Sequence, residues 1–354
     1  MIAVSALLRQ AVYPVMARAG AFARRLSSGS VAVLTYHGVI DEPVMGASPV
    51  ETGLIAAPAF RRHLRYLKSR YHLISPDLVQ GWLRGDESDL PARPLLLTCD
   101  DGLRNNLTVM VPILREEGVQ CLFFVTGASL EEDAGCLWYD DLYRLLAPAP
   151  SGAAVSVGGK TVRLTFSGAA ERMNAWWCLV EELSGLPEDE RRTTLHSLRR
   201  ELGSSGGVKA GPSLLNRAEL GELVRQGMSV GAHTLSHPVL AKMPAACAER
   251  EIRECKSRLE SFLQREVWAL AYPFGHDGSA GVREMAMAER AGFSCAFMNC
   301  GGGLLRRESP RFALPRAHVT AAMNLATVEA HLSGFHTAIQ RGVRGGRAEN
   351  VECA

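Results

Sequence analysis

The chain has 354 residues, of which 47% are hydrophobic, and its formal net charge at pH 7 is +2. This length fits two average domains or one α/β barrel, and the apolar share supports a large buried core. The near-neutral charge argues against the strongly basic surface typical of nucleic-acid binding, so we expect no nucleic-acid partner. Nine scattered cysteines without a C-x-x-C pair argue against a zinc ribbon or a disulfide framework, and we expect reduced, mostly buried thiols.

Residues 1–30 are predicted to form an N-terminal amphipathic helix. Arginines interrupt its Ala-, Val- and Leu-rich sequence, and no apolar run approaches the ~20 residues of a membrane span. The charges fall within and after the apolar stretch, unlike those of a signal peptide. Two roles fit equally: a helix that caps the barrel floor, or an anchor on a membrane surface. Because no export signal is evident, we expect a cytoplasmic protein, with peripheral contact to the inner face of the membrane if the helix is an anchor.

Continuous apolar runs alternate with helical patterns from residue 31 onward. We expect strands at 31–36, 71–75, 95–98, 120–126, 228–232, 267–272 and 293–297, and helices at 60–70, 107–117, 247–263 and 282–291. Apolar strands between helices indicate a parallel sheet that is covered on both faces. The predicted fold is therefore α/β, an open or incomplete (β/α) barrel of six or seven parallel strands within a domain at 31–340.

One segment, at about 129–212, breaks this alternation with a mainly helical pattern. Residues 155–166 within it are predicted to form a hairpin that turns at Gly158–Gly159. We interpret the segment as an insertion over the barrel mouth that shapes a substrate groove, although a packed excursion without ligand contact fits nearly as well. The Gly- and Arg-rich residues 341–354 are predicted to be a disordered tail.

Polar residues that could carry chemistry follow several predicted strands. They are Tyr36–His37, Asp100–Asp101, His233 and Tyr272–Pro273. In (β/α) barrels the catalytic residues lie at the C-terminal ends of the strands, so we expect one shared site. One carboxylate with His233 and His237 would make a divalent-metal set with open positions, which leaves the second carboxylate free as a base. The four-residue spacing predicts that both histidines lie on one face of a helical turn. Helix capping by Asp100 and Asp101 is the simpler alternative, but it leaves the histidines unexplained.

Three motifs resemble those of the polysaccharide deacetylases, the NodB-homology carbohydrate esterases. They are T-C-D-D-G at 98–102, H-T-L-S-H at 233–237 and A-Y-P-F-G at 271–275. Their order agrees with the family, and the resemblance runs from about residue 31 to 335, interrupted by the insertion. It implies a distorted (β/α) barrel that hydrolyses the N-acetyl group of an amino sugar in a glycan, glycolipid or glycan precursor.

The resemblance also implies roles for individual residues. Asp100 matches the catalytic base of the family, while Asp101, His233 and His237 match its metal ligands. The backbone at Tyr272 would help to hold the oxyanion that forms as water attacks the amide carbonyl. An Asp-His-His set suits zinc first, although nickel, cobalt, iron and manganese tolerate the same ligands.

For two roles, the general acid and the residue that orients the catalytic base, this sequence matches the motifs of the family less directly. His37 is our first candidate for the acid, because T-Y-H-G at 35–38 is similar to members that begin with a Tyr-His strand end, and His318 is second. Ala271 replaces the arginine that normally orients the base, so Asp100 needs another partner. We expect Arg316, in the L-P-R sequence at 314–316, to take this place.

Two alternative functions stay open at this point. The same barrel could hydrolyse another amide or an O-acetyl ester with the same metal set. A carbohydrate-binding protein that has lost catalysis is the second alternative, and the missing motif arginine is its best support. An N-acetylated carbohydrate is the expected partner in the preferred interpretation.

Overall fold

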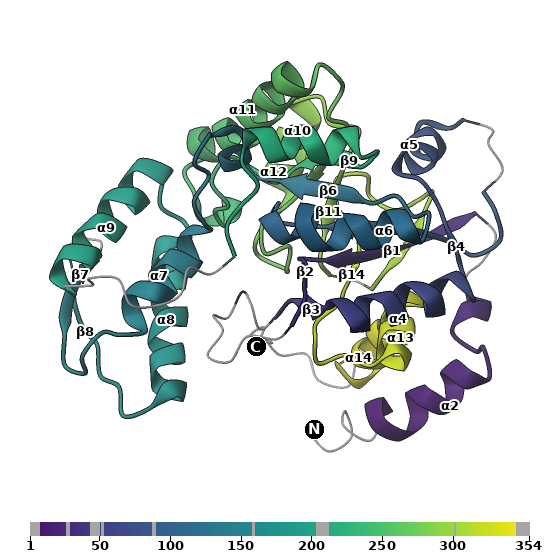
Figure 1. Ribbon diagram of the computed structural model, residues 1–354, viewed down its shortest axis with the longest axis horizontal. Coiled ribbons are helices and arrows are strands. Elements are labelled where there is room, and N and C mark those ends of the chain that lie inside the picture. Colours follow the sequence, from purple (N-terminus) through teal and green to yellow (C-terminus); the bar gives the residue numbers. More distant parts are fainter. Residues whose placement is uncertain are drawn as a thin grey trace.

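The structure is a computed structural model that describes residues 8–25, 29–42, 50, 53–86, 90–157, 160–202, 212–300 and 302–344. Its centre is a mostly parallel sheet that curls into a nearly closed barrel (Figure 1). Around the sheet the parallel strands are β1 (Ser30–Tyr36), β5 (Pro94–Cys99), β6 (Leu122–Val125), β9 (Ser229–Ala232), β10 (Ala269–Ala271), β11 (Cys295–Met298) and β13 (Leu314–Pro315). The predicted distorted (β/α) barrel is confirmed.

The segment that contains β13 and β14 (Ala317–His318) closes the barrel. β13 pairs with β11, whereas β14, one residue further along, pairs with β1. Arg316 therefore lies between the last and the first strand. The other strands pair at the margins of the sheet or next to it: β12 (Leu304–Arg306) with β1, β4 (His72–Leu73) with β5, and β2 (Val39–Ile40) with β3 (Ile55–Ala56).

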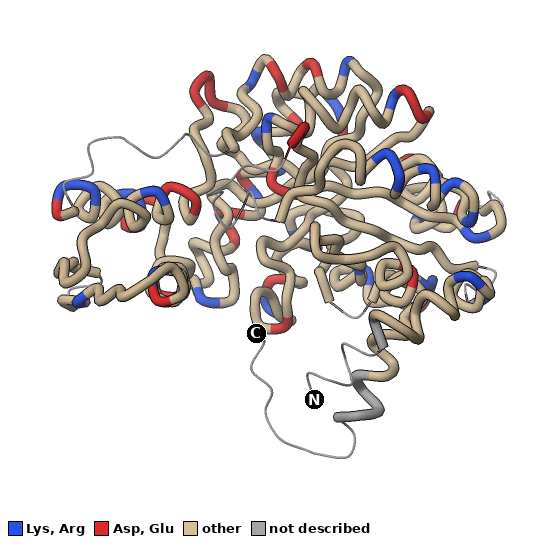
Figure 2. Tube along the Cα trace, turned by 60° about the horizontal axis from the view of Figure 1, so that its bottom comes forward, with Lys and Arg blue, Asp and Glu red and all other residues tan. Residues whose placement is uncertain are grey.

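Helices surround this sheet. They are α4 (Ala57–Lys68), α6 (Val111–Glu116), α10 (Arg217–Arg225), α11 (Ala245–Leu263), α12 (Val282–Arg290), α13 (Leu325–Leu332) and α14 (Phe335–Arg344), with short turns η4 (Gly127–Leu130) and η5 (Leu240–Lys242). Acidic and basic residues are interspersed along the outer helices (Figure 2). The predicted helix at 107–117 begins instead as a π-helical turn, η3 (Asn106–Met110), followed by α6. Pro112 explains this difference, because it has no N–H for the regular helical hydrogen bond.

Strand alternation divides the apolar core into two layers. Leu34 and Leu97 pack with the surrounding helices, whereas Val33, Leu96 and Phe124 form a second cluster together with α5 (Pro76–Arg84). Because successive side chains of a strand face opposite ways, the second set faces the barrel interior. Along β5 the interior-facing side chains after Leu96 are polar: Thr98, and then Asp100 just past the end of the strand. The barrel interior therefore becomes polar at the C-terminal ends of the strands.

The insertion forms a separate body next to the barrel (Figure 1). It contains α7 (Trp138–Leu146), β7 (Ala154–Val157), β8 (Lys160–Arg163), α8 (Ala169–Leu183) and α9 (Glu188–Glu201). These elements bury their own hydrophobic cluster, which includes Leu142, Trp176 and Leu198. β7 and β8 pair antiparallel with Val157 opposite Lys160, and the predicted turn at 158–159 lies outside the described residues.

The described N-terminal residues pack against the C-terminal part of the chain. They form η1 (Leu8–Val12), α2 (Tyr13–Arg18) and η2 (Ala23–Arg25), and Tyr13 and Phe22 are buried against α13. Val15, which lies in α2, is 66% exposed. None of the described helices is long and apolar enough to span a membrane. Membrane contact stays a prediction, and residues 1–7, 26–28 and 345–354, which include most of the predicted tail, lie outside the described residues.

Candidate active site

Asp101, His233 and His237 converge on one buried point at the C-terminal end of the strands. The Nε2 atoms of His233 and His237 lie 3.4 and 3.3 Å from Oδ1 of Asp101, and each residue is at most 3% exposed. This Oδ1 atom is buried without a hydrogen-bond partner among the described residues. Ligands about 2.1 Å from a tetrahedral zinc ion lie about 3.4 Å apart, so the three groups fit a divalent metal of this kind. A divalent metal would satisfy this buried carboxylate oxygen, which lies between the two imidazoles.

The two histidines do not lie on a helical turn, which corrects the prediction from their spacing. Residues 233–237 form an irregular loop after β9, with positive φ at Thr234 (63°) and His237 (57°). The backbone N–H of His237 donates to the Thr234 hydroxyl (3.1 Å), which closes the loop. His233 is fixed by a hydrogen bond between its Nδ1 and the carbonyl oxygen of Ala271, 2.8 Å away. The loop, and not a helix, therefore aims both rings at Asp101.

A left-handed backbone conformation at Asp101 and Gly102 lets the adjacent residues Asp100 and Asp101 both reach the site. Asp101 and Gly102 have φ values of 76° and 68°, which turn the chain directly after β5. A Cβ atom on Gly102 would lie 3.0 Å from the Val125 side chain, so glycine suits this position in both conformation and space. Asp100 and Asp101 consequently point to different partners from neighbouring positions.

Asp100 pairs with Arg316 inside the barrel. The guanidinium donates to both carboxylate oxygens, at 2.7 and 2.6 Å, and to the Thr98 hydroxyl at 3.2 Å. Both side chains are at most 1% exposed, and the guanidinium lies over the rings of Phe124 and Phe297. Burial alone would raise the pKa of Asp100, but the charge and hydrogen bonds of Arg316 outweigh it and hold this pKa below its usual range. The contact expected for Arg316 is present, and its role stays a prediction.

His37 and His318 lie together beside this pair. Their ring centroids are 4.6 Å apart, as expected from the pairing of β1 with β14. Nδ1 of His37 is buried without a hydrogen-bond partner among the described residues. Burial, reinforced by the neighbouring His37, lowers the pKa of His318 to about 3. His318 is therefore uncharged at neutral pH, and the role of His37 as the proton donor stays a prediction.

The backbone amide and the hydroxyl of Tyr272 both make hydrogen bonds within the protein. Its N–H donates to the carbonyl oxygen of Phe297 at 3.1 Å, which extends the pairing of β10 with β11. Its hydroxyl donates to the carbonyl oxygen of Phe312, also at 3.1 Å. An amide that is hydrogen-bonded within the sheet must give up that bond to hold an oxyanion. The role of Tyr272 in holding an oxyanion therefore stays a prediction.

Aromatic residues next to His237 are contributions that the sequence analysis missed. Tyr139 of the insertion and Phe274 of the barrel pack on its ring, with centroids 5.3 and 5.0 Å away. Trp138 Nε1 donates to the carbonyl oxygen of His237 at 2.9 Å. A Trp-Tyr pair at the start of a helix is usual in a hydrophobic core, so only the tertiary contact identifies these residues.

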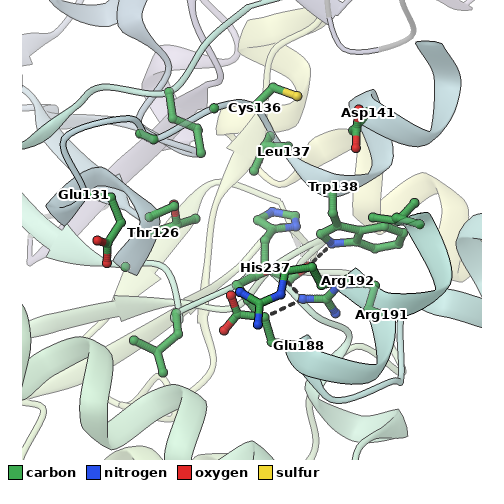
Figure 3. Close-up of a pocket in the computed structure, with 18 of the residues that line it drawn as sticks. Thr126, Glu131, Cys136, Leu137, Trp138, Asp141, Glu188, Arg191, Arg192 and His237 are labelled. Carbon is green, nitrogen blue, oxygen red and sulfur yellow. Dashed lines mark hydrogen bonds between the residues drawn. The ribbon is translucent and has the colours of Figure 1, made fainter. Parts of the chain in front are cut away.

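A cavity of about 440 Å³ lies between the insertion and the barrel, beside His237 (Figure 3). Arg191 of α9 lines it and is 2% exposed. Burial lowers the pKa of Arg191 to about 10, partly offset by the charge of Glu251, so the guanidinium stays charged at neutral pH. The insertion is thus in direct contact with the loop that carries His233 and His237.

Known structures share this architecture. Streptococcus pyogenes deacetylase PplD, solved in complex with acetate, is 18% identical, with a TM-score of 0.54 and coverage of 86% of this chain and 99% of that one. IcaB from Ammonifex degensii gives 19% identity, a TM-score of 0.54 and coverage of 87% and 98%. A de-N-acetylase from Aggregatibacter actinomycetemcomitans gives 13% identity, a TM-score of 0.54 and coverage of 85% and 99%. At these identities the likeness shows the fold.

Sequence comparison supplies the family. No curated protein gave a match. The family model for polysaccharide deacetylase matches residues 87–295, which is more than half of the chain and includes all three motifs. The chain therefore belongs to the polysaccharide deacetylase family, hydrolases that act on carbon–nitrogen bonds other than peptide bonds.

Proposed function

We propose that this protein removes the acetyl group from an N-acetylated amino sugar within a glycan, glycolipid or glycan precursor. The observation that carries the proposal is the buried triangle of Asp101, His233 and His237 beside the ion pair of Asp100 and Arg316. A metal-binding point next to an ionised carboxylate is the arrangement that hydrolysis of an unreactive amide needs.

Asp101, His233 and His237 would hold the metal, and zinc suits one carboxylate and two imidazoles best. A divalent ion held there would supply Lewis acidity for the acetyl carbonyl and for the attacking water. Asp100 takes the proton of that water, because Arg316 keeps its carboxylate ionised and fixed in orientation. His37 protonates the departing amine.

The test combines metal content with acetate release from N-acetylglucosamine oligomers. We expect about one divalent ion per chain in the wild type by mass spectrometry, and loss of both ion and activity in Asp101→Ala and His233→Ala. His276→Ala is the matched control, because His276 is exposed at the barrel mouth and does not belong to the buried triangle.

Other outcomes would redirect the proposal. Metal without acetate release would move the search to other amides or O-acetyl esters. A wild-type protein that binds no metal after reconstitution would contradict the proposal and favour a carbohydrate-binding role.

A further inference from the structure

The loop that carries His237 has an unfavourable backbone conformation, and contacts from outside the loop must stabilise it. Both Thr234 and His237 adopt positive φ, which is unfavourable for residues with side chains. His233 is oriented by the Ala271 carbonyl, whereas Nδ1 of His237 has no hydrogen-bond partner among the described residues. A metal-ligating histidine usually donates its second ring N–H to a fixed acceptor. Apart from the packing of Tyr139 and Phe274 on its ring, the position of His237 therefore depends on how its backbone is held.

The barrel holds one side of this loop through Glu251 of α11. Its carboxylate accepts hydrogen bonds from the backbone N–H groups of Leu235 and Ser236, at 2.8 and 2.9 Å, and from the Ser236 hydroxyl at 2.6 Å. Glu251 is 4% exposed. Burial raises its pKa, while the hydrogen bonds from Ser236 oppose this effect.

The insertion holds the other side. Arg191 of α9 donates to the carbonyl oxygen of Ser236 at 2.9 Å and to its hydroxyl at 2.6 Å. The same guanidinium lies 4.9 Å from the Trp138 ring, whose N–H donates to the carbonyl oxygen of His237 (Figure 3). Ser236 thus links a buried cation from the insertion to the buried Glu251 of the barrel.

We propose that Arg191 and Trp138 are positioning residues that hold His237 in place for the metal, so that the helical insertion sets the metal affinity of the barrel site. This inference rests on the metal site of the proposed function. Outer partners that orient metal ligands change metal affinity 10- to 100-fold in other proteins. Because coupling between two binding events is reciprocal, metal binding also stabilises the contact of α9 with the loop.

The test measures zinc affinity by competition with a chromogenic chelator, without any substrate. We expect Arg191→Met to raise the zinc Kd about 10- to 100-fold, and Arg191→Lys to restore part of the affinity. Arg192→Met is the matched control: Arg192 is the next residue of α9, is exposed, and contacts Asp189 of its own helix. Its zinc Kd should stay within about twofold of the wild type.

Trp138→Phe is the second variant and decides the question if Arg191→Met does not fold. It keeps an aromatic ring but removes the N–H that binds the His237 carbonyl, so the zinc Kd should rise at least about threefold. Zinc should also slow amide hydrogen exchange in α9 of the wild type but not of Arg191→Met. Unchanged affinity in the folded variants would overturn this inference and leave the proposed function intact. A wild type without zinc binding would overturn both.

Discussion

Asp100 is a fully buried carboxylate, and its ionised state depends on Arg316. Removing one partner of such a pair leaves an uncompensated charge in the interior, which destabilises proteins by about 3–5 kcal/mol. We therefore predict that Arg316→Met lowers the free energy of unfolding by about this amount in urea titrations. Turnover should fall about 100-fold, because the carboxylate also loses its fixed orientation.

The double variant Asp100→Asn with Arg316→Met separates the two effects. It should recover most of the lost stability, because no buried charge is left unpaired, but none of the activity. A single Arg316→Met variant with wild-type stability and turnover would show that the pair observed here has neither role.

His63 predicts a pH dependence of stability. It lies in α4, is 8% exposed and sits 3.4 Å from the Tyr36 hydroxyl. Burial, with a smaller effect of Arg62, lowers its pKa from 6.5 to about 4. Between these values the unfolded chain binds the proton and the folded chain does not, so stability falls as the pH drops from about 6.5 to 4.

For this histidine the linkage amounts to about 2 kcal/mol between pH 7 and pH 5. We expect His63→Gln to lose about that much less stability than the wild type over this interval, measured by urea unfolding at both pH values. The exposed His196→Gln should behave as the wild type. Parallel pH curves for His63→Gln and the wild type would contradict the assignment.

β9 illustrates how one strand limits the residues that it accepts. A Cβ atom on Gly231 would lie 2.5 Å from the Phe124 ring and 3.1 Å from the carbonyl oxygen of Ala269. Gly231→Ala should therefore lower the free energy of unfolding by about 1–3 kcal/mol through overpacking. Gly221→Ala is the control, because its added Cβ would meet only Phe262, at an ordinary 3.7 Å, and alanine is favourable inside helix α10. If both variants had the same free energy of unfolding, β6 and β9 could move apart to make room for the added Cβ at no cost in stability.

The strands and outer helices were largely predictable as elements. Apolar runs such as 95–98 predicted β5 within two residues, because a strand buried on both faces needs continuous apolar side chains. The two-residue strands β13 and β14 were not predicted, since they carry too few residues for a pattern. Their pairing depends on neighbours that are distant in the sequence, yet they close the barrel and place Arg316.

Metal binding should be visible as stability of the whole protein. A ligand that binds only the folded state stabilises it by about 2.7 kcal/mol when present at 100 times its Kd. We predict this increase on adding Zn²⁺ at that concentration, and its reversal by a chelator, in denaturant unfolding. Asp101→Asn should show neither change, whereas His276→Ala should respond as the wild type. If neither zinc nor the chelator changed the midpoint of denaturant unfolding, the result would contradict a metal site in the triangle.

The sequence by itself determined the barrel class, the family motifs and the identity of the residues in the buried triangle, because these depend on local patterning and on short motifs. Tertiary structure alone decided that the two histidines are carried by a loop, that the Tyr272 amide is used within the sheet, and that the insertion contacts His237. Such contacts join residues up to about a hundred positions apart, as between Trp138 and His237 (99 residues). No local pattern encodes them, because they arise only when packing brings distant segments together.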